Sequence, residues 1–93
     1  MKINFKQLKR YSSPKRDKFV LVDTREVLAD RIFNETGSGI ADLRLSEKIY
    51  DSDENTEFSE REVARIKIHV AQVLPWLLAG LEDYLEFEEE DNR

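Results

Sequence analysis

The amino-acid sequence predicts a mainly α-helical single domain, residues 1–93, with a small β element on its N-terminal side. The first observation is length, because 93 residues suffice for one hydrophobic core but not for two domains. The second is composition, since 40% of the residues are hydrophobic, 38% are charged and only three are glycine. The third is the helical three-and-four spacing of apolar residues through the second half of the chain. We therefore expect about three helices.

The β element is predicted from two short runs rich in aromatic and β-branched residues, 3–5 (Ile-Asn-Phe) and 19–22 (Phe-Val-Leu-Val). The turn-prone segment Ser12-Ser13-Pro14 lies between them. This pattern predicts a small N-terminal β-ribbon or two strand-like pieces. An isolated two-stranded ribbon is marginal in water, so we expect it to pack on the helices.

A first helix is expected at roughly 24–35 and a second at roughly 40–50. The Asp23 carboxylate can cap the free N–H groups at the start of the first helix. Gly37 and Gly39 can end that helix, because glycine adopts the left-handed conformation at little cost.

The longest helix is expected at roughly 60–87. Ser59 and Glu62 have the spacing of a capping box, in which each side chain binds a main-chain N–H of the other residue. Pro75 lacks an N–H and clashes with the preceding turn, so we expect the helix to break near it.

After residue 73 the apolar arc of this helix widens, and a helix that is apolar on more than one face needs more than one neighbour. This arc predicts a surface for self-association or for a protein partner. The alternative is that the arc is simply core. The candidate partner-binding residues are Trp76, Leu77, Leu78, Leu81 and Leu85.

The net charge of −5 hides a strong segregation. Residues 1–18 hold seven basic residues against one acidic residue, a net charge of +6, so the remainder carries −11. We expect a mobile basic arm over 1–18 and a mobile acidic tail over 86–93. The basic residues of the arm that could meet an acidic partner are Lys6, Lys9, Arg10, Lys15, Arg16 and Lys18.

Nucleic acid is one such partner. Phe5, Tyr11 and Phe19 are interspersed among the basic residues, and this combination can follow a phosphate backbone and stack on bases. The sequence pI near 4.9 is not typical of a dedicated nucleic-acid binder. Contact with nucleic acid is therefore an alternative to the protein-interaction hypothesis.

Several classes of function are excluded or disfavoured by what the sequence lacks. With no cysteine, the chain has no disulfide framework, no thiolate zinc site and no cysteine nucleophile. No run approaches the roughly 18 apolar residues of a membrane span, so we expect a cytoplasmic protein without a membrane segment. A lone helical histidine, His69, is more often a packing or surface residue than a catalytic base. No nucleophile motif or glycine-rich phosphate loop accompanies it, so we predict a non-catalytic protein.

The acidic segment 51–62 resembles the calcium loop of the EF-hand family. The matching candidate ligands are Asp51, Asp53, Asn55, Glu57 and Glu62. The resemblance covers roughly 40–73 and implies bound calcium. Thr56 stands where the family has a glycine with positive φ, a conformation that strains a β-branched residue. The other interpretation of this segment is a solvated loop before a capped helix, with no ligand.

A second resemblance covers more of the chain. It rests on the segments 22–29 (Val-Asp-Thr-Arg-Glu-Val-Leu-Ala), 45–50 (Leu-Ser-Glu-Lys-Ile-Tyr), 58–63 (Phe-Ser-Glu-Arg-Glu-Val) and 74–76 (Leu-Pro-Trp). Together they look like small uncharacterised proteins encoded in prophages and other mobile elements. The resemblance implies an accessory or assembly role through protein contacts and supplies no catalytic residue. Our leading expectation is a small non-catalytic accessory or adaptor protein.

Overall fold

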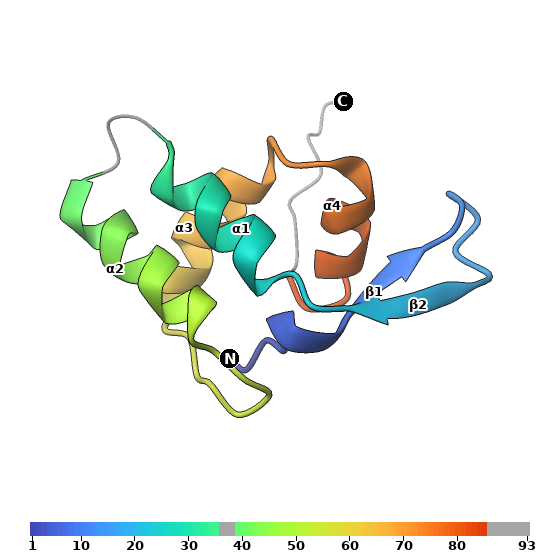
Figure 1. The fold of residues 1–93 in the computed structure, drawn as a ribbon, viewed down its shortest axis with the longest axis horizontal. Coiled ribbons are helices and arrows are strands. Elements are labelled where there is room, and N and C mark those ends of the chain that lie inside the picture. The colour runs from blue at the N-terminus through green and yellow to red at the C-terminus, as the bar shows by residue number, and fades with distance from the viewer. Residues whose placement is uncertain (36–38, 86–93) are drawn as a thin grey trace.

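The computed structural model describes residues 1–35 and 39–85 and contains a two-stranded sheet and four α-helices in this part of the chain (Figure 1). In chain order, the elements are the 3-10 helix η1 (Phe5–Gln7), β1 (Leu8–Tyr11), β2 (Phe19–Val22), α1 (Arg25–Phe33), α2 (Gly39–Tyr50), α3 (Glu60–Val70) and α4 (Pro75–Leu81). The expected class, mainly α with a small N-terminal β element, is confirmed. The ribbon formed by β1 and β2 projects from the helices, and α4 lies beside β1.

The ribbon differs from the prediction in its first strand. β2 occupies the expected residues 19–22, but its antiparallel partner is 8–11 and not 3–5, with Leu8 opposite Val22 and Tyr11 opposite Phe19. Residues 3–5 lead instead into η1 and supply core side chains. Most side chains of β1 are polar or charged, so its strand character comes from pairing with β2 and not from its own hydrophobicity.

The first helix begins one residue later than predicted, at Arg25, and ends at Phe33. The Asp23 carboxylate accepts a hydrogen bond from the Arg25 N–H at 3.1 Å, as a capping side chain does. Thr24, at the capping position itself, is buried, and its hydroxyl donates to the Phe5 carbonyl at 2.9 Å. This contact ties the start of α1 to η1.

The long helix expected at 60–87 is two helices, α3 and α4, separated at the predicted place. Pro75 is the first residue of α4, a position where its missing N–H costs nothing. α4 ends at Leu81 and is followed by turns over residues 82–84, so it is shorter than expected. The last two expected helical residues, 86–87, lie outside the described part of the chain. The predicted acidic tail, 86–93, also lies outside it.

The capping box at the start of α3 is confirmed. The Glu62 N–H donates to the Ser59 hydroxyl at 3.1 Å, and the Ser59 N–H donates to the Glu62 carboxylate at 2.8 Å. Phe58, just before the box, is buried and meets Phe5 edge-to-face with ring centres 5.5 Å apart.

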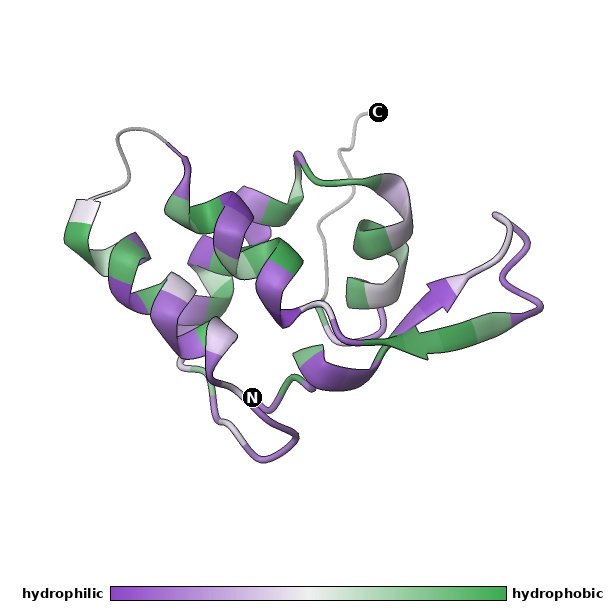
Figure 2. Ribbon diagram, viewed as in Figure 1, coloured by the Kyte–Doolittle hydropathy of each residue, from purple (hydrophilic) through white to green (hydrophobic). Residues whose placement is uncertain are grey.

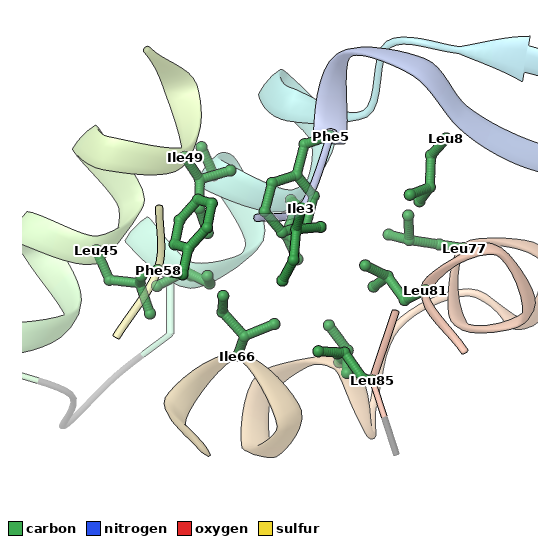
Figure 3. Close-up of a cluster of buried hydrophobic side chains, with 14 residues drawn as sticks. Ile3, Phe5, Leu8, Leu45, Ile49, Phe58, Ile66, Leu77, Leu81 and Leu85 are labelled. Carbon is green, nitrogen blue, oxygen red and sulfur yellow. The ribbon is translucent and has the colours of Figure 1, made fainter. Parts of the chain in front are cut away.

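One hydrophobic core joins the N-terminal segment to all four helices (Figure 3). Ile3, Phe5 and Leu8 are almost completely buried in it. These residues belong to the arm over 1–18 that was expected to be mobile, and their burial anchors this part of it to the helices. Burial of each such side chain stabilises the fold by about 1.5–3 kcal/mol.

Candidate functional site

The acidic loop is held by contacts within the chain. The Asp53 carboxylate accepts hydrogen bonds from the Asn55 N–H at 2.8 Å and from the Thr56 hydroxyl at 3.1 Å. The Asn55 hydrogen bond, followed by that from Thr56, lowers the pKa of Asp53 below its ordinary value. Thr56 is not among the described residues with positive φ, so the loop turns without the conformation that the EF-hand requires of this position.

The two glutamates proposed as ligands also have partners in the chain. Glu57 lies 2.6 Å from the α-amino nitrogen of Met1, and this hydrogen bond lowers the pKa of Glu57. Partial burial raises the pKa of Glu62, but hydrogen bonds from Lys48 and from the Ser59 N–H outweigh burial and hold that pKa below its ordinary value. In residues 1–35 and 39–85, no three carboxylate or imidazole groups gather closely enough to hold a metal ion. In this conformation, Asp53, Glu57 and Glu62 of the acidic loop therefore accept hydrogen bonds from the chain itself, and the loop leads into the capped start of α3.

Three basic residues of the arm contact the start of α4 or the turn that follows its last residue. Arg16 donates to Glu82 at 2.5 Å, and this hydrogen bond raises the pKa of Arg16. The Arg10 guanidinium lies 4.4 Å from the centre of the Trp76 ring. Lys9 approaches Asp83 at 4.0 Å.

The other candidate basic residues are less engaged. Lys15 and Lys18, in the exposed turn of the ribbon, form no ion pair with any described residue. Lys6, in η1, is exposed and likewise forms no ion pair with any described residue. The basic charge without an ion pair therefore lies both at the tip of the ribbon and in η1.

The candidate partner surface on α4 is mostly core. Leu77, Leu81 and Leu85 are almost completely buried and point toward the other core side chains (Figure 3). Trp76 and Leu78 are half-buried against the core. The predicted five-residue face is therefore corrected to two residues that retain some exposure. A wide apolar arc looks alike whether it meets a partner or the chain's own ribbon, and here it meets β1.

His69 was expected to be a packing or surface residue, and it is a buried member of an ionic cluster that the sequence did not reveal. Asp42 on α2 receives hydrogen bonds from the Arg65 guanidinium, at 3.0 Å for Nε, and lies 2.9 Å from Nε2 of His69. Nδ1 of His69 lies 3.7 Å from Glu35. Both ring nitrogens of His69 thus face carboxylates. The cluster links α2 to α3, because Asp42 on α2 contacts both Arg65 and His69 on α3.

The longest consecutive run of exposed large apolar side chains in the described residues lies on β2, which was expected only as a structural strand. Phe19, Val20 and Leu21 are 48%, 61% and 53% exposed. Figure 2 shows this apolar strand running along the projecting ribbon. The sequence held a signal for this exposure. An unbroken apolar run such as 19–22 is typical of a strand that is covered on both faces, and a two-stranded ribbon leaves part of such a strand uncovered.

The main chain of β2 is open along one edge. The Ser12 N–H donates to the Lys18 carbonyl at 3.0 Å. Hydrogen-bonded pairs alternate along an antiparallel ladder, so the next ones are Arg10 with Val20 and Leu8 with Val22. Val20 and Val22 therefore direct their main-chain groups at β1. Phe19 and Leu21 direct theirs away from it, and β2 has no further strand beside it in the described residues. We call residues 19–22 with this edge the β2 edge.

The opposite edge of the ribbon is covered. On β1, the Lys9 carbonyl points away from β2. Helix α4 packs against this carbonyl at Gly80. A Cβ at Gly80 would overlap the Lys9 carbonyl oxygen and crowd the Leu8 side chain. The missing side chain thus allows the helix to approach the strand closely.

Comparison of the chain with family models, with curated proteins and with solved structures found no match. Among the described helices, none combines the length and the apolar composition needed to cross a membrane. The candidate site therefore rests on geometry alone, and the β2 edge is its strongest element.

Proposed function

We propose that this chain is a small non-catalytic accessory or adaptor protein that acts through protein contacts, with the β2 edge as its contact surface. One observation carries the proposal: three consecutive large apolar side chains are exposed beside an unpaired strand edge. Proteins normally blunt such an edge with lysine, proline, a bulge or a covering element, because it is a template for pairing with another chain. Residues 19–22 contain no lysine or proline.

Elsewhere on the described surface, exposed apolar side chains do not follow one another along a single strand. Other exposed apolar side chains, such as Phe33 on α1, Ile68 on α3 and Leu74 before α4, are spread over separate elements. Single exposed apolar residues of this kind are normal on a soluble fold. On β2, exposed apolar side chains and free main-chain groups coincide along consecutive residues, and this coincidence suits recognition by strand addition.

Less supports the two alternatives. For calcium, the candidate carboxylates at Asp53, Glu57 and Glu62 already accept hydrogen bonds from the chain. For nucleic acid, Lys9 and Arg16 face acidic residues near the end of α4, which reduces the positive field of the arm.

Site-specific cross-linking tests the proposal. A photoreactive residue is placed at Val20 of the full chain, and a matched one at Ile68, which is 58% exposed on α3. In cells that naturally produce the chain, we expect covalent adducts from position 20 and few from position 68. Equal labelling from both positions, or no adduct from position 20, would contradict the proposal.

A further inference from the structure

We infer that the β2 edge is occupied by β2 of a second copy of this chain, in an antiparallel pair with Val20 opposite Val20 of the second copy. This inference rests on the proposed function and names its partner. The result is a four-stranded sheet, β1-β2-β2-β1, whose outer edges are each covered by α4.

The main-chain groups restrict the register to pairings in which outward-facing residues of the two strands meet. In a symmetric antiparallel pair, one residue lies opposite itself on the two-fold axis. With Val20 on the axis, Phe19 of one copy faces Leu21 of the other, and these are the residues whose N–H and C=O groups point away from β1. Both outward residues of each strand then find partners at once.

The side chains favour the same register over its two neighbours. With Val20 on the axis, Val20 meets Val20 and Phe19 meets Leu21, so the central cross-strand pairs are all apolar. Centring the pair on Phe19 would set Leu21 opposite Asp17, and centring it on Leu21 would set Phe19 opposite Asp23. Either shift places an apolar side chain against a carboxylate.

Charge complementarity supports a second copy as the occupant. Because the strands are antiparallel, the ribbon turn of one copy lies alongside the chain that follows β2 in the other. The turn segment 15–18 holds three basic residues and one acidic residue. The chain after β2 opens onto a hollow lined by three carboxylates and one guanidinium. Its lining residues are Asp23, Arg25, Glu26, Tyr50 and Asp51.

Asp17 comes directly opposite Asp23 of the second copy, and this like-charge pair costs stability. Successive side chains of a strand alternate between its two faces, so Lys18 projects from the face opposite to Asp23 of the second copy. The attraction therefore comes from the net charge of +2 over residues 15–18 beside the net charge of −2 in the lining of the hollow, and not from one paired contact. Two-fold symmetry repeats this attraction at the other end of the pair.

Measurement of the mass in solution tests the inference. A four-residue strand is a short interface, so we expect a concentration-dependent equilibrium in which the mass rises from 11.0 kDa toward twice that value. High salt should shift the equilibrium back toward the monomer. A species that stays monomeric near millimolar concentration would overturn the inference.

A matched pair of variants locates the interface. Val20→Glu places two carboxylates on the two-fold axis, while within its own chain the new side chain lies opposite Arg10, so the ribbon should keep its fold. Ile68→Glu makes the same change at a comparably exposed site on α3. We expect Val20→Glu to abolish the dimer and Ile68→Glu to retain it, with unchanged thermal melts in both. Equal dimerisation of the two variants would refute the inference.

The outcomes separate this inference from the proposed function. A monomeric protein that nevertheless cross-links another protein from position 20 would refute the second copy and leave the proposed function standing. A monomer with no adduct from position 20 would remove both.

Discussion

Along β1 the edge of the ribbon lies against α4, whereas along β2 the edge faces solvent. Gly80 brings the helix onto the outward Lys9 carbonyl, and Leu8 packs beneath it in the core. Across the ribbon, Leu21 has the same outward main-chain geometry as Lys9 and no covering element in the described residues. One edge of the ribbon is thus covered by the fold itself, whereas the other has main-chain groups without a strand partner in the described residues.

The largest expected effect comes from shortening a leucine on each strand. Leu8→Ala removes a buried side chain and should lower the free energy of unfolding by about 3 kcal/mol. Leu21→Ala removes an exposed one and should change it by less than about 0.5 kcal/mol. Chemical denaturation of the monomer measures both. Similar losses for the two variants would mean that β2 is covered in the monomer after all.

Gly80→Ala tests how the β1 edge is covered. In most helix interiors this change stabilises by about 1 kcal/mol, because alanine is the better helix former. At Gly80 the added Cβ overlaps the Lys9 carbonyl, so we expect a net destabilisation of about 2 kcal/mol. A thermal melt gives the sign. Gly39→Ala should also destabilise, but through backbone strain at a φ of +80° and not through a clash, because an added Cβ there meets open space.

The fold was predictable where the signal is local. Ser59 and Glu62 make the expected capping box because both partners lie within one turn, and Pro75 separates the last two helices because its constraint acts on its own backbone. β1 was missed because residues 8–11 become a strand only through pairing with β2, a contact that local hydrophobicity does not encode.

The candidate site was less predictable for the same reason. The apolar arc that includes Leu77 and Leu81 was assigned to a partner, but α4 turns these residues onto the ribbon and into the core. The run Phe19 to Val22 was visible, yet its exposure depends on how many strands the sheet has. The contact between Asp42 and His69 joins two helices, so no sequence spacing reports it.

Acid pH should lower the free energy of unfolding through the acidic loop. Unlike the main-chain groups of the β2 edge, the carboxylates of this loop have hydrogen-bond partners within the chain. The pKa of Glu62 is lowered in the folded state, so its stabilisation is complete above its unfolded pKa, near 4.5, and is lost as the pH falls through the folded pKa. Denaturation across this range should show a loss of less than about 1 kcal/mol from this group. Glu62→Gln should flatten the acid limb, whereas Glu60→Gln, on the same turn but outside the capping box, should leave it unchanged.

Calcium should have the smallest effect. The carboxylates of the loop are already bound by Ser59, Lys48 and Asn55, so the melting temperature in millimolar calcium should equal that in chelator. A calcium-dependent rise would show that the loop rearranges into an EF-hand-like site, and the contrast between a closed loop and an open strand edge would then need revision.

Hydrogen exchange at the β2 amides tests the central claim most directly. In the dilute protein, the Phe19 and Leu21 amides should exchange rapidly, while those of Val20 and Val22 are protected by β1. As the concentration rises, protection at Phe19 and Leu21 should increase in step with the dimer. The account would be contradicted if these two amides were protected in the dilute monomer, or if they stayed unprotected at every concentration.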